Sequence, residues 1–127
     1  MTIVAILVGG LVGTGLRLGI DALLPHADDA FPWSTLLINV VGSFALGALV
    51  ARLWPVAPHW LKAGLGAGLL GSFTTFSALA VSLVTLAEAD EWLLGASYLA
   101  VSLVAGLAAA TAGLFLGRRP EPIGVEE

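Results

Sequence analysis

The chain has 127 residues, of which 58% are hydrophobic and 11% are charged, and its net charge is −4. Its mean hydropathy of +1.00 excludes an ordinary small soluble domain, because so much apolar surface would aggregate in water. The absence of cysteine excludes disulfides and thiolate metal sites, and no basic-aromatic patch of the kind that binds nucleic acid is present. No nucleophile, base and orienting group occur together, so the sequence does not predict an enzyme.

Long uncharged runs predict membrane-spanning helices, since about 20 apolar residues cross a bilayer core. Residues 30–51, 63–87 and 92–117 contain no charged side chain, whereas the first apolar run includes Arg17 and Asp21 near its end. We therefore expect a single transmembrane domain over residues 1–117 and a polar C-terminal tail over residues 118–127. The expected spans are residues 2–24, 33–54, 61–87 and 92–117.

Residues at the ends of these spans support the boundaries and predict an orientation. Tryptophan gathers at membrane interfaces, and Trp33, Trp54, Trp60 and Trp92 all fall at expected span ends. An even number of spans places both termini on one side of the membrane. That side also holds most of the cations, which are Arg52, Lys62, Arg118 and Arg119. The positive-inside rule therefore favours cytoplasmic termini.

The first span contains the glycine-dense segment GGLVGTGLRLG and Arg17, the one cation that lies more than two residues inside an expected span. Arg17 either forms a positive vestibule for anions or is a snorkelling side chain paired with Asp21, four residues later. Glycines spaced four apart share a helix face and let helices approach closely, within one subunit or between subunits. The pairs with this spacing are Gly9/Gly13, Gly15/Gly19, Gly64/Gly68 and Gly113/Gly117.

The second and fourth spans each carry a polar line on one face, because residues four apart lie together on a helix. These lines are Thr35 with Asn39, and Tyr98 with Ser102 and then Gly106, which leaves room. An asparagine in hydrocarbon needs partners, so Asn39 either joins helices or offers an N–H donor to a pore. Tyr98 is otherwise an interfacial anchor, and Ser102 otherwise bonds back to its own helix. Two parallel lines favour a polar track.

The centre of the third span, GSFTTFSAL, is polar where hydrocarbon is expected. Gly71 weakens a helix, and the hydroxyls of Thr74 and Thr75 compete with its backbone bonds, so we expect local unwinding rather than an intact helix. Irregular backbone at this depth survives where it lines a cavity, and free carbonyls suit a hard cation such as Na⁺. The positive edge of the Phe76 ring favours a small anion if the ring faces a pore, and otherwise the ring packs against lipid or core.

These segments resemble the Fluc (CrcB) family of bacterial fluoride channels over residues 3–117. The resemblance is carried by GGLVGTGLRLG in the first span, STLLINVVGSF in the second, GAGLLGSFTTFSAL in the third, and Tyr98 with Ser102 in the fourth. It implies an all-α membrane protein with four transmembrane helices per subunit, a broken third helix and an antiparallel dual-topology dimer. It also implies a fluoride-selective channel for passive F⁻ export across the bacterial cytoplasmic membrane, giving fluoride resistance.

The resemblance further implies roles for individual residues. Its pore and fluoride-binding positions correspond to Asn39, Phe76, Ser102, Tyr98, Thr75 and Thr35, and its vestibule arginine corresponds to Arg17. The backbone carbonyls of Gly71 and Thr74 would hold a structural Na⁺ at the dimer centre, with the same carbonyls of the second copy. The implied partners are fluoride, the lipid bilayer and a second copy of the chain in antiparallel orientation.

The sequence departs from the family pattern in the third and fourth spans. A second phenylalanine, common in the family three residues after the first, is Leu79 here, and a hydroxyl residue further along the fourth span is Gly106. The biased cations leave open a heterodimer with an oppositely oriented paralogue, because dual topology usually accompanies little bias. A small multidrug-type exporter is a further alternative, but it requires a carboxylate inside the first span, and Asp21 lies near the end of that span.

Overall fold

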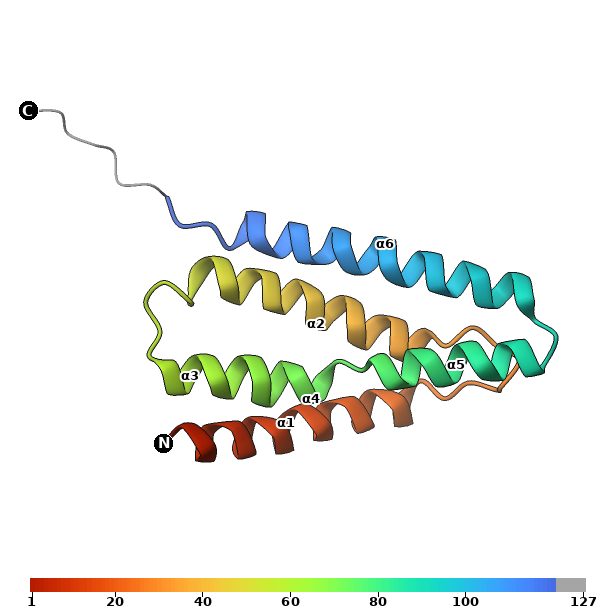
Figure 1. The fold of residues 1–127 in the computed structure, drawn as a ribbon, viewed down its shortest axis with the longest axis horizontal. Helices are drawn as coiled ribbons and strands as arrows, with labels where there is room; N and C mark the ends of the chain where they lie inside the picture. Colours follow the sequence, from red (N-terminus) through yellow and green to blue (C-terminus); the bar gives the residue numbers. More distant parts are fainter. Residues whose placement is uncertain (121–127) are drawn as a thin grey trace, which may run out of the picture.

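The computed structural model describes residues 1–120 as a bundle of long helices lying side by side (Figure 1). Residues 121–127, which belong to the expected polar tail, lie outside the described residues. The elements are α1 (Thr2–Leu23), α2 (Trp33–Arg52), α3 (His59–Ala63), the π-helix η1 (Gly64–Leu70), α4 (Gly71–Phe73), α5 (Phe76–Glu88) and α6 (Trp92–Leu116). Both ends of the described chain and the α2–α3 loop lie at one end of the bundle.

The four spans expected from the uncharged runs are present as helices long and apolar enough to cross a membrane. They are α1, α2, the stretch His59–Glu88 and α6. Only 6% of the apolar window of α1, and the same share of α6, is buried inside the subunit. Most of their apolar side chains therefore point outward, which suits a surface covered by hydrocarbon rather than by water.

The third span is built from several pieces rather than one regular helix. After Pro58, the α-helix α3 widens into the π-helix η1, where glycine stands at positions 64, 66 and 68. α4 ends at Phe73, and the backbone of Thr74 (φ −76°, ψ 152°) and Thr75 (φ −147°, ψ 118°) is extended. The helical path resumes at Phe76 as α5.

The first half of the third span packs against α1 through glycines. We call Gly9, Gly13, Gly64 and Gly68 the glycine seam. A side chain at Gly9 or Gly13 would collide with atoms of η1 and α4, one at Gly64 would collide with the Ala5 Cβ, and one at Gly68 would collide with the Ile6 backbone. The backbones are therefore so close that only hydrogen fits between them, which increases van der Waals contact where hydrophobic burial supplies little.

The α2–α6 interface uses the same device. A side chain at Gly47 would collide with the Ala110 carbonyl, and one at Gly113 would collide with the Phe44 carbonyl. Three of the four sequence-predicted glycine pairs thus pack within the subunit. By contrast, nothing lies within 4 Å of a methyl group placed at Gly15 or Gly19, so this pair faces away from the subunit.

The second half of the third span packs against α6 around a small core. This core consists of Leu36, Leu79, Leu86 and Tyr98, and the partly buried Phe31 packs against it. The rings of Phe31 and Tyr98 meet edge to face, with centroids 5.3 Å apart. Tyr98 has no exposed surface, so its position is fixed by packing on every side. This rigid packing sets the position of the Tyr98 hydroxyl discussed below.

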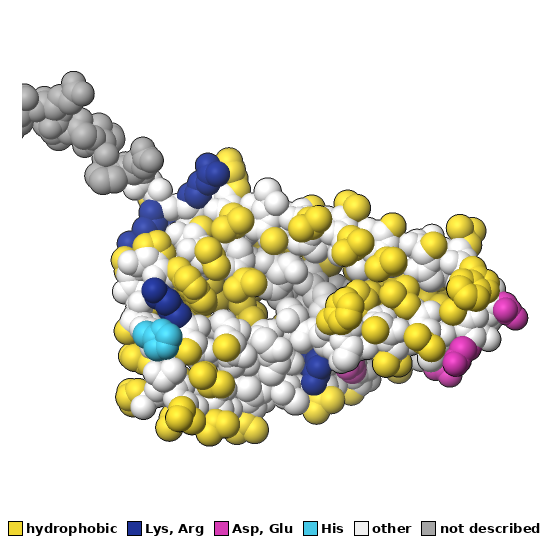
Figure 2. Space-filling view, viewed as in Figure 1, with side chains coloured by type: hydrophobic (Ala, Val, Ile, Leu, Met, Phe, Trp, Pro, Cys, Tyr) yellow, Lys and Arg dark blue, Asp and Glu magenta, His cyan; other side chains and the backbone are white. Residues whose placement is uncertain are grey.

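Charged side chains separate toward the two ends of the bundle (Figure 2). Most lysine and arginine side chains gather at the end where the chain termini lie, and most aspartate and glutamate side chains at the opposite end, whereas one basic and one acidic side chain lie together near the middle. At the basic end, the Arg119 Nε donates a hydrogen bond of 3.0 Å to the Arg52 carbonyl at the end of α2. A cation at a helix C-terminus is favoured by the helix dipole. The bundle therefore has one basic and one acidic rim.

Candidate functional site

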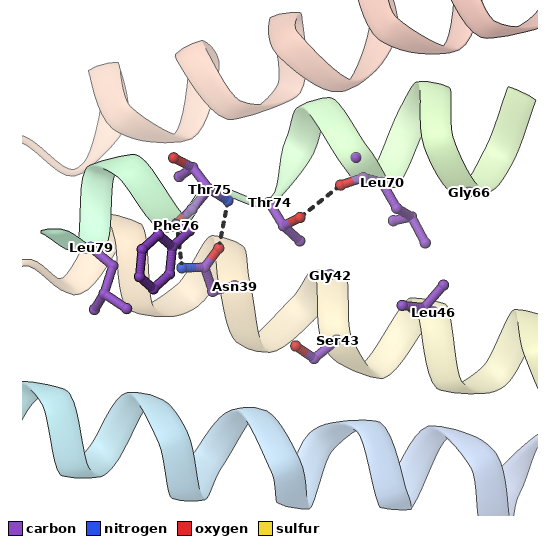
Figure 3. A pocket seen from close by; sticks show the side chains of 11 residues that line it. Asn39, Gly42, Ser43, Leu46, Gly66, Leu70, Thr74, Thr75, Phe76 and Leu79 are labelled. Carbon is purple, nitrogen blue, oxygen red and sulfur yellow. Dashed lines mark hydrogen bonds between the residues drawn. The ribbon is translucent and has the colours of Figure 1, made fainter.

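The extended backbone between α4 and α5 is paired with a single side chain from α2 (Figure 3). The Thr75 backbone N–H donates to Asn39 Oδ1 at 2.8 Å, and Asn39 Nδ2 donates to the Thr75 carbonyl at 3.0 Å. The asparagine amide thus pairs with the chain as a neighbouring backbone would. Asn39 lies near the middle of α2, so this pairing sets the break at the centre of the bundle.

Local hydrogen bonds hold each side of the break. On the α5 side, the Thr75 hydroxyl accepts from the Ala78 N–H at 3.0 Å, which caps the new helix. On the α4 side, the Thr74 hydroxyl donates to the Leu70 carbonyl at 2.9 Å. Within residues 1–120, the carbonyls of Gly71 and Thr74 accept no hydrogen bond from a side chain. They also accept none of the backbone N–H hydrogen bonds that lie outside the regular helices.

A cavity of about 360 Å³ opens beside the break, and we call it the central cavity. Asn39, Thr75 and Phe76 line it together with Gly71, Thr74 and Leu79, from three different helices and the break between them. Phe76 is 79% exposed, so it does not pack into the subunit core. Leu79 is instead 8% exposed and belongs to the core around Tyr98. The position of the second family phenylalanine is therefore a packing position in this chain.

A second polar group, which we call the hydroxyl cluster, lies between α2, α5 and α6. It consists of Thr35, Ser82, Tyr98 and Ser102. The side chains of the other three face the Tyr98 hydroxyl, but the buried Tyr98 and Ser102 oxygens have no partner in hydrogen-bonding geometry. A buried hydroxyl without a partner costs about 1–3 kcal/mol. The subunit therefore carries unused donors at this point.

A cavity of about 380 Å³ connects the hydroxyl cluster with the acidic end of the bundle, and we call it the end cavity. Thr35 and Ser82 line its inner part, and Asp21, His26 and Asp28 line it from α1 and the α1–α2 loop. The loop residues are exposed to water, whereas Thr35 and Ser82 are buried. The end cavity thus provides a route from water to buried hydroxyls.

Hydroxyl side chains of the spans differ in whether they bond back to the preceding helical turn. Those that donate to a carbonyl three or four residues earlier include Ser72, Thr74, Thr85, Ser97 and Thr111. Among residues 1–120, no such bond is found for Thr35, Ser43, Ser82 and Ser102, nor for Thr14 and Ser34. Thr14 lines a separate cavity beside α1, whereas the other five line the central or end cavity or belong to the hydroxyl cluster.

The structure brings the sequence-predicted residues together in two places. Asn39, Thr75 and Phe76 meet at the central cavity, and Thr35, Tyr98 and Ser102 meet in the hydroxyl cluster. Arg17 lies on α1, partly buried, and lines neither cavity, although Asp21, one turn later, lines the end cavity.

Sequence reasoning missed Ser82 and Ser43. Ser82 lies on one helix face with the buried Leu79 and Leu86, and that spacing marks it as an inward hydroxyl. Ser43 follows Asn39 by one turn on α2 and lines the central cavity. The available signal for Ser43 was its position four residues after Asn39, which places both side chains on the same face of the helix.

The two polar places offer N–H and O–H donors in a setting with few charges. Residues 1–120 contain no group of three or more histidine or acidic side chains that could hold a metal ion. Neutral donors in an apolar surrounding bind anions more strongly than they would in water, because the surrounding dielectric is low. The arrangement therefore offers neutral hydrogen-bond donors of the kind that can contact a small anion.

A family model and curated relatives match most of this chain. The family model described as "CrcB-like protein, Camphor Resistance (CrcB)" matches residues 4–114. A protein of Xanthomonas euvesicatoria pv. vesicatoria (strain 85-10), named fluoride-specific ion channel FluC, is 42% identical over 113 residues, covering 87% of this chain and 85% of its own length.

Further relatives carry similar names. A fluoride-specific ion channel FluC of Paracoccus denitrificans (strain Pd 1222) is 38% identical over 117 residues, covering 92% of this chain and 94% of its own length. FluC 2 of Geobacillus kaustophilus (strain HTA426) is 38% identical over 124 residues, covering 95% of each chain. The match with the family model and the nearly full-length relatives show that this chain belongs to the CrcB family.

Proposed function

We propose that this chain is the subunit of a fluoride-selective ion channel in the bacterial inner membrane. The observation that carries the proposal is the near full-length similarity to proteins named fluoride-specific ion channels, at 42% and 38% identity. Four apolar spans fit a multi-pass membrane protein. Neutral donors at the break and in the hydroxyl cluster supply chemistry that fits an anion.

Selectivity would come from replacing the water that fluoride holds. A pore must offer fixed donors in place of the hydration shell if a small, strongly hydrated ion is to enter. The N–H of Asn39 and the edge of Phe76 would serve at the central cavity. The hydroxyls of Thr35, Tyr98 and Ser102 would serve further along, where the Tyr98 and Ser102 oxygens lack internal partners. Chloride is larger and would fit this path less well.

The proposed assembly is a dimer of antiparallel copies, in which each pore is lined by both subunits. Phe76 is 79% exposed although it lies beside polar groups, so the central cavity is incomplete in one subunit. Antiparallel packing would place the basic rim of one copy beside the acidic rim of the other, which is electrostatically favourable. The outward-facing Gly15 and Gly19 provide a surface for close approach.

A structural Na⁺ at the centre of the dimer is the proposed cofactor. The carbonyls of Gly71 and Thr74 are neutral oxygen ligands without a hydrogen-bond donor from the break or from side chains of residues 1–120. Hard cations prefer such ligands. One subunit offers too few of them for a complete shell, so the second copy would contribute the same carbonyls.

The channel would export fluoride passively. HF crosses membranes uncharged and dissociates in a more alkaline cytoplasm, which traps F⁻ inside. A membrane potential that is negative inside is worth about 2.3 kcal/mol per charge per 100 mV and drives the anion out. No pump, proton donor or cofactor turnover is required.

The direct test is ion efflux from liposomes. Purified protein should release trapped F⁻ at least about tenfold faster than trapped Cl⁻, as expected for a pore that selects by dehydration. Protein-free liposomes provide the baseline. Equal release of the two halides would refute the proposed selectivity.

The competing functions are not favoured by the similarity to fluoride channels. A small multidrug-type exporter needs an embedded carboxylate, and Asp21 lies in the last turn of α1 where it lines the end cavity. Proton-coupled drug uptake after a pH jump would reveal such activity. A heterodimer would differ only in the second subunit, and membrane-impermeant labelling of tagged termini from each face would distinguish one orientation from two.

A further inference from the structure

We propose that Asn39 is a positioning residue as well as a donor: the backbone of the break locks its amide so that only N–H, and never the amide carbonyl, faces the central cavity. What this N–H binds rests on the proposed function. The lock itself rests only on contacts between α2 and the break, and it can be tested without any ion.

The two hydrogen bonds between Asn39 and Thr75 fix the amide orientation. Oδ1 accepts from the Thr75 N–H at 2.8 Å, and Nδ2 donates to the Thr75 carbonyl at 3.0 Å. Rotating the amide by half a turn would place its NH₂ against an N–H and its oxygen against a carbonyl. Both hydrogen bonds would be lost and replaced by contacts between like dipoles, so a single orientation is stable.

The break needs Asn39 for a reciprocal reason. In a continuous helix the Thr75 N–H would bond to the Gly71 carbonyl, but the extended backbone at this point removes that partner. Thr75 is only 7% exposed, so water does not readily replace the lost bond, and an unpaired N–H at membrane depth is costly. Asn39 supplies the missing acceptor.

The lock determines what the central cavity presents. Nδ2 carries two hydrogens, and the bond to Thr75 uses one of them. Asn39 lines the central cavity together with Phe76, whose ring edge is also positive. A freely turning amide would expose its carbonyl to an anion for part of the time. A locked amide offers its spare hydrogen without reorganisation when the anion arrives.

Two variants separate the acceptor from the donor. Asn39→Asp keeps an oxygen for the Thr75 N–H but, as a carboxylate, has no hydrogen for the Thr75 carbonyl or for the cavity. Asn39→Ala removes both the acceptor and the donors. If the lock exists, the aspartate variant keeps the bond from the Thr75 N–H and loses both Nδ2 hydrogens, whereas the alanine variant loses the bond from the Thr75 N–H as well.

Amide hydrogen exchange measured by NMR on the full chain in detergent micelles tests the lock. The Thr75 amide should exchange slowly in the wild type and about tenfold or more faster in Asn39→Ala, because an unpaired amide loses its protection. Asn39→Asp, which keeps only the acceptor, should exchange at a rate between the two. The neighbouring Thr74 amide, which bonds to the Leu70 carbonyl at 3.0 Å, is the internal control and should change little. Unchanged Thr75 exchange in Asn39→Ala, or exchange in Asn39→Asp as fast as in Asn39→Ala, would overturn the lock.

Fluoride current through single channels in planar bilayers tests the presented N–H, because unit current does not depend on how much protein is folded. Asn39→Asp should reduce it by about tenfold or more, since a carboxylate repels the anion that the N–H attracts. Wild-type current in Asn39→Asp would overturn the donor role. If the wild type itself carries no fluoride current, the proposed function fails, while the exchange experiment still decides whether the lock exists.

Discussion

The two halves of the third span lie in the same helix-like path but are held by different physics. The first half packs against α1 through the glycine seam, with backbone against backbone and no room for a side chain. The second half packs against α6 through buried side chains, among which the Tyr98 hydroxyl lacks a partner. The break at Thr74 and Thr75 is the point where the span exchanges α1 for α6 as its main partner.

This difference shows how one span can be held rigidly and still present unpaired hydrogen-bond donors. Close glycine packing is geometrically strict, so the first half serves as an anchor for the break. The second half tolerates unpaired donors because Phe31, Leu86 and other apolar groups hold the tyrosine ring in place. Stability and anion chemistry are therefore expected to respond to mutations in different halves.

The largest effect is expected in the glycine seam. Gly13→Ala should lower the free energy of unfolding by about 2–3 kcal/mol or abolish the folded protein, because overpacking against a close backbone cannot relax easily. Its methyl group would collide with the Leu69 carbonyl and the Ser72 hydroxyl. The measurement is yield of monodisperse protein and its thermal unfolding in detergent.

Gly10→Ala is the matched control on the same helix. Nothing lies within 4 Å of a methyl group at Gly10, and alanine favours a helix over glycine by about 1 kcal/mol. This variant should be as stable as the wild type or more stable. Similar damage from both substitutions would show that α1 is sensitive to helix composition rather than to the seam.

A smaller effect, on transport alone, is expected beside the break. Phe76→Leu keeps an apolar side chain but removes the positive ring edge, so fluoride efflux should fall about tenfold, equivalent to about 1.4 kcal/mol in the barrier. Because Phe76 is 79% exposed, the unfolding temperature of the subunit should change little. Phe115→Leu, at a ring that is 65% exposed near the end of α6, is the control and should conduct normally.

A still smaller effect is expected at the N-terminal cap of α5. Thr75→Val keeps the branched shape that suits extended backbone but removes the acceptor for the Ala78 N–H, at a cost of about 1 kcal/mol in unfolding free energy. Thr75→Ser retains a hydroxyl and should recover most of this loss. Chemical denaturation of the reconstituted protein measures both. Equal stability of the valine variant and the wild type would mean that the break is held by Asn39 without the cap.

The spans were predictable because a long uncharged run at a bilayer thickness has few alternative interpretations. The packing partners of the glycine pairs were not predictable from the sequence. A glycine pair indicates that another helix can approach closely, but it does not indicate which helix does so. Gly15 and Gly19 look the same in the sequence as Gly9 and Gly13, yet they face outward. Only the packed structure distinguishes them.

The sequence predicted which residues belong to the candidate site, but not which hydrogen bonds join them. Hydroxyls and an amide at four-residue spacing marked Thr35, Asn39, Tyr98 and Ser102. The sequence could not reveal that Asn39 pairs with the Thr75 backbone, because such a bond depends on where another helix is interrupted. The spacing of Ser82 with Leu79 and Leu86 indicated an inward side chain, but not that its hydroxyl would face Tyr98 on α6.

The smallest expected change in stability is in the hydroxyl cluster. Tyr98→Phe removes an oxygen that has no partner in good hydrogen-bonding geometry and leaves the ring in its packing, so the unfolding free energy should stay within about 0.5 kcal/mol or rise. Fluoride conductance should nevertheless fall several-fold, because the lost hydroxyl is one of the donors left free for the anion. Ser102→Ala should behave alike at the neighbouring unpaired oxygen. A clear loss of stability in Tyr98→Phe would mean that the hydroxyl bonds within the subunit, and the contrast with the glycine seam would then be one of packing density alone.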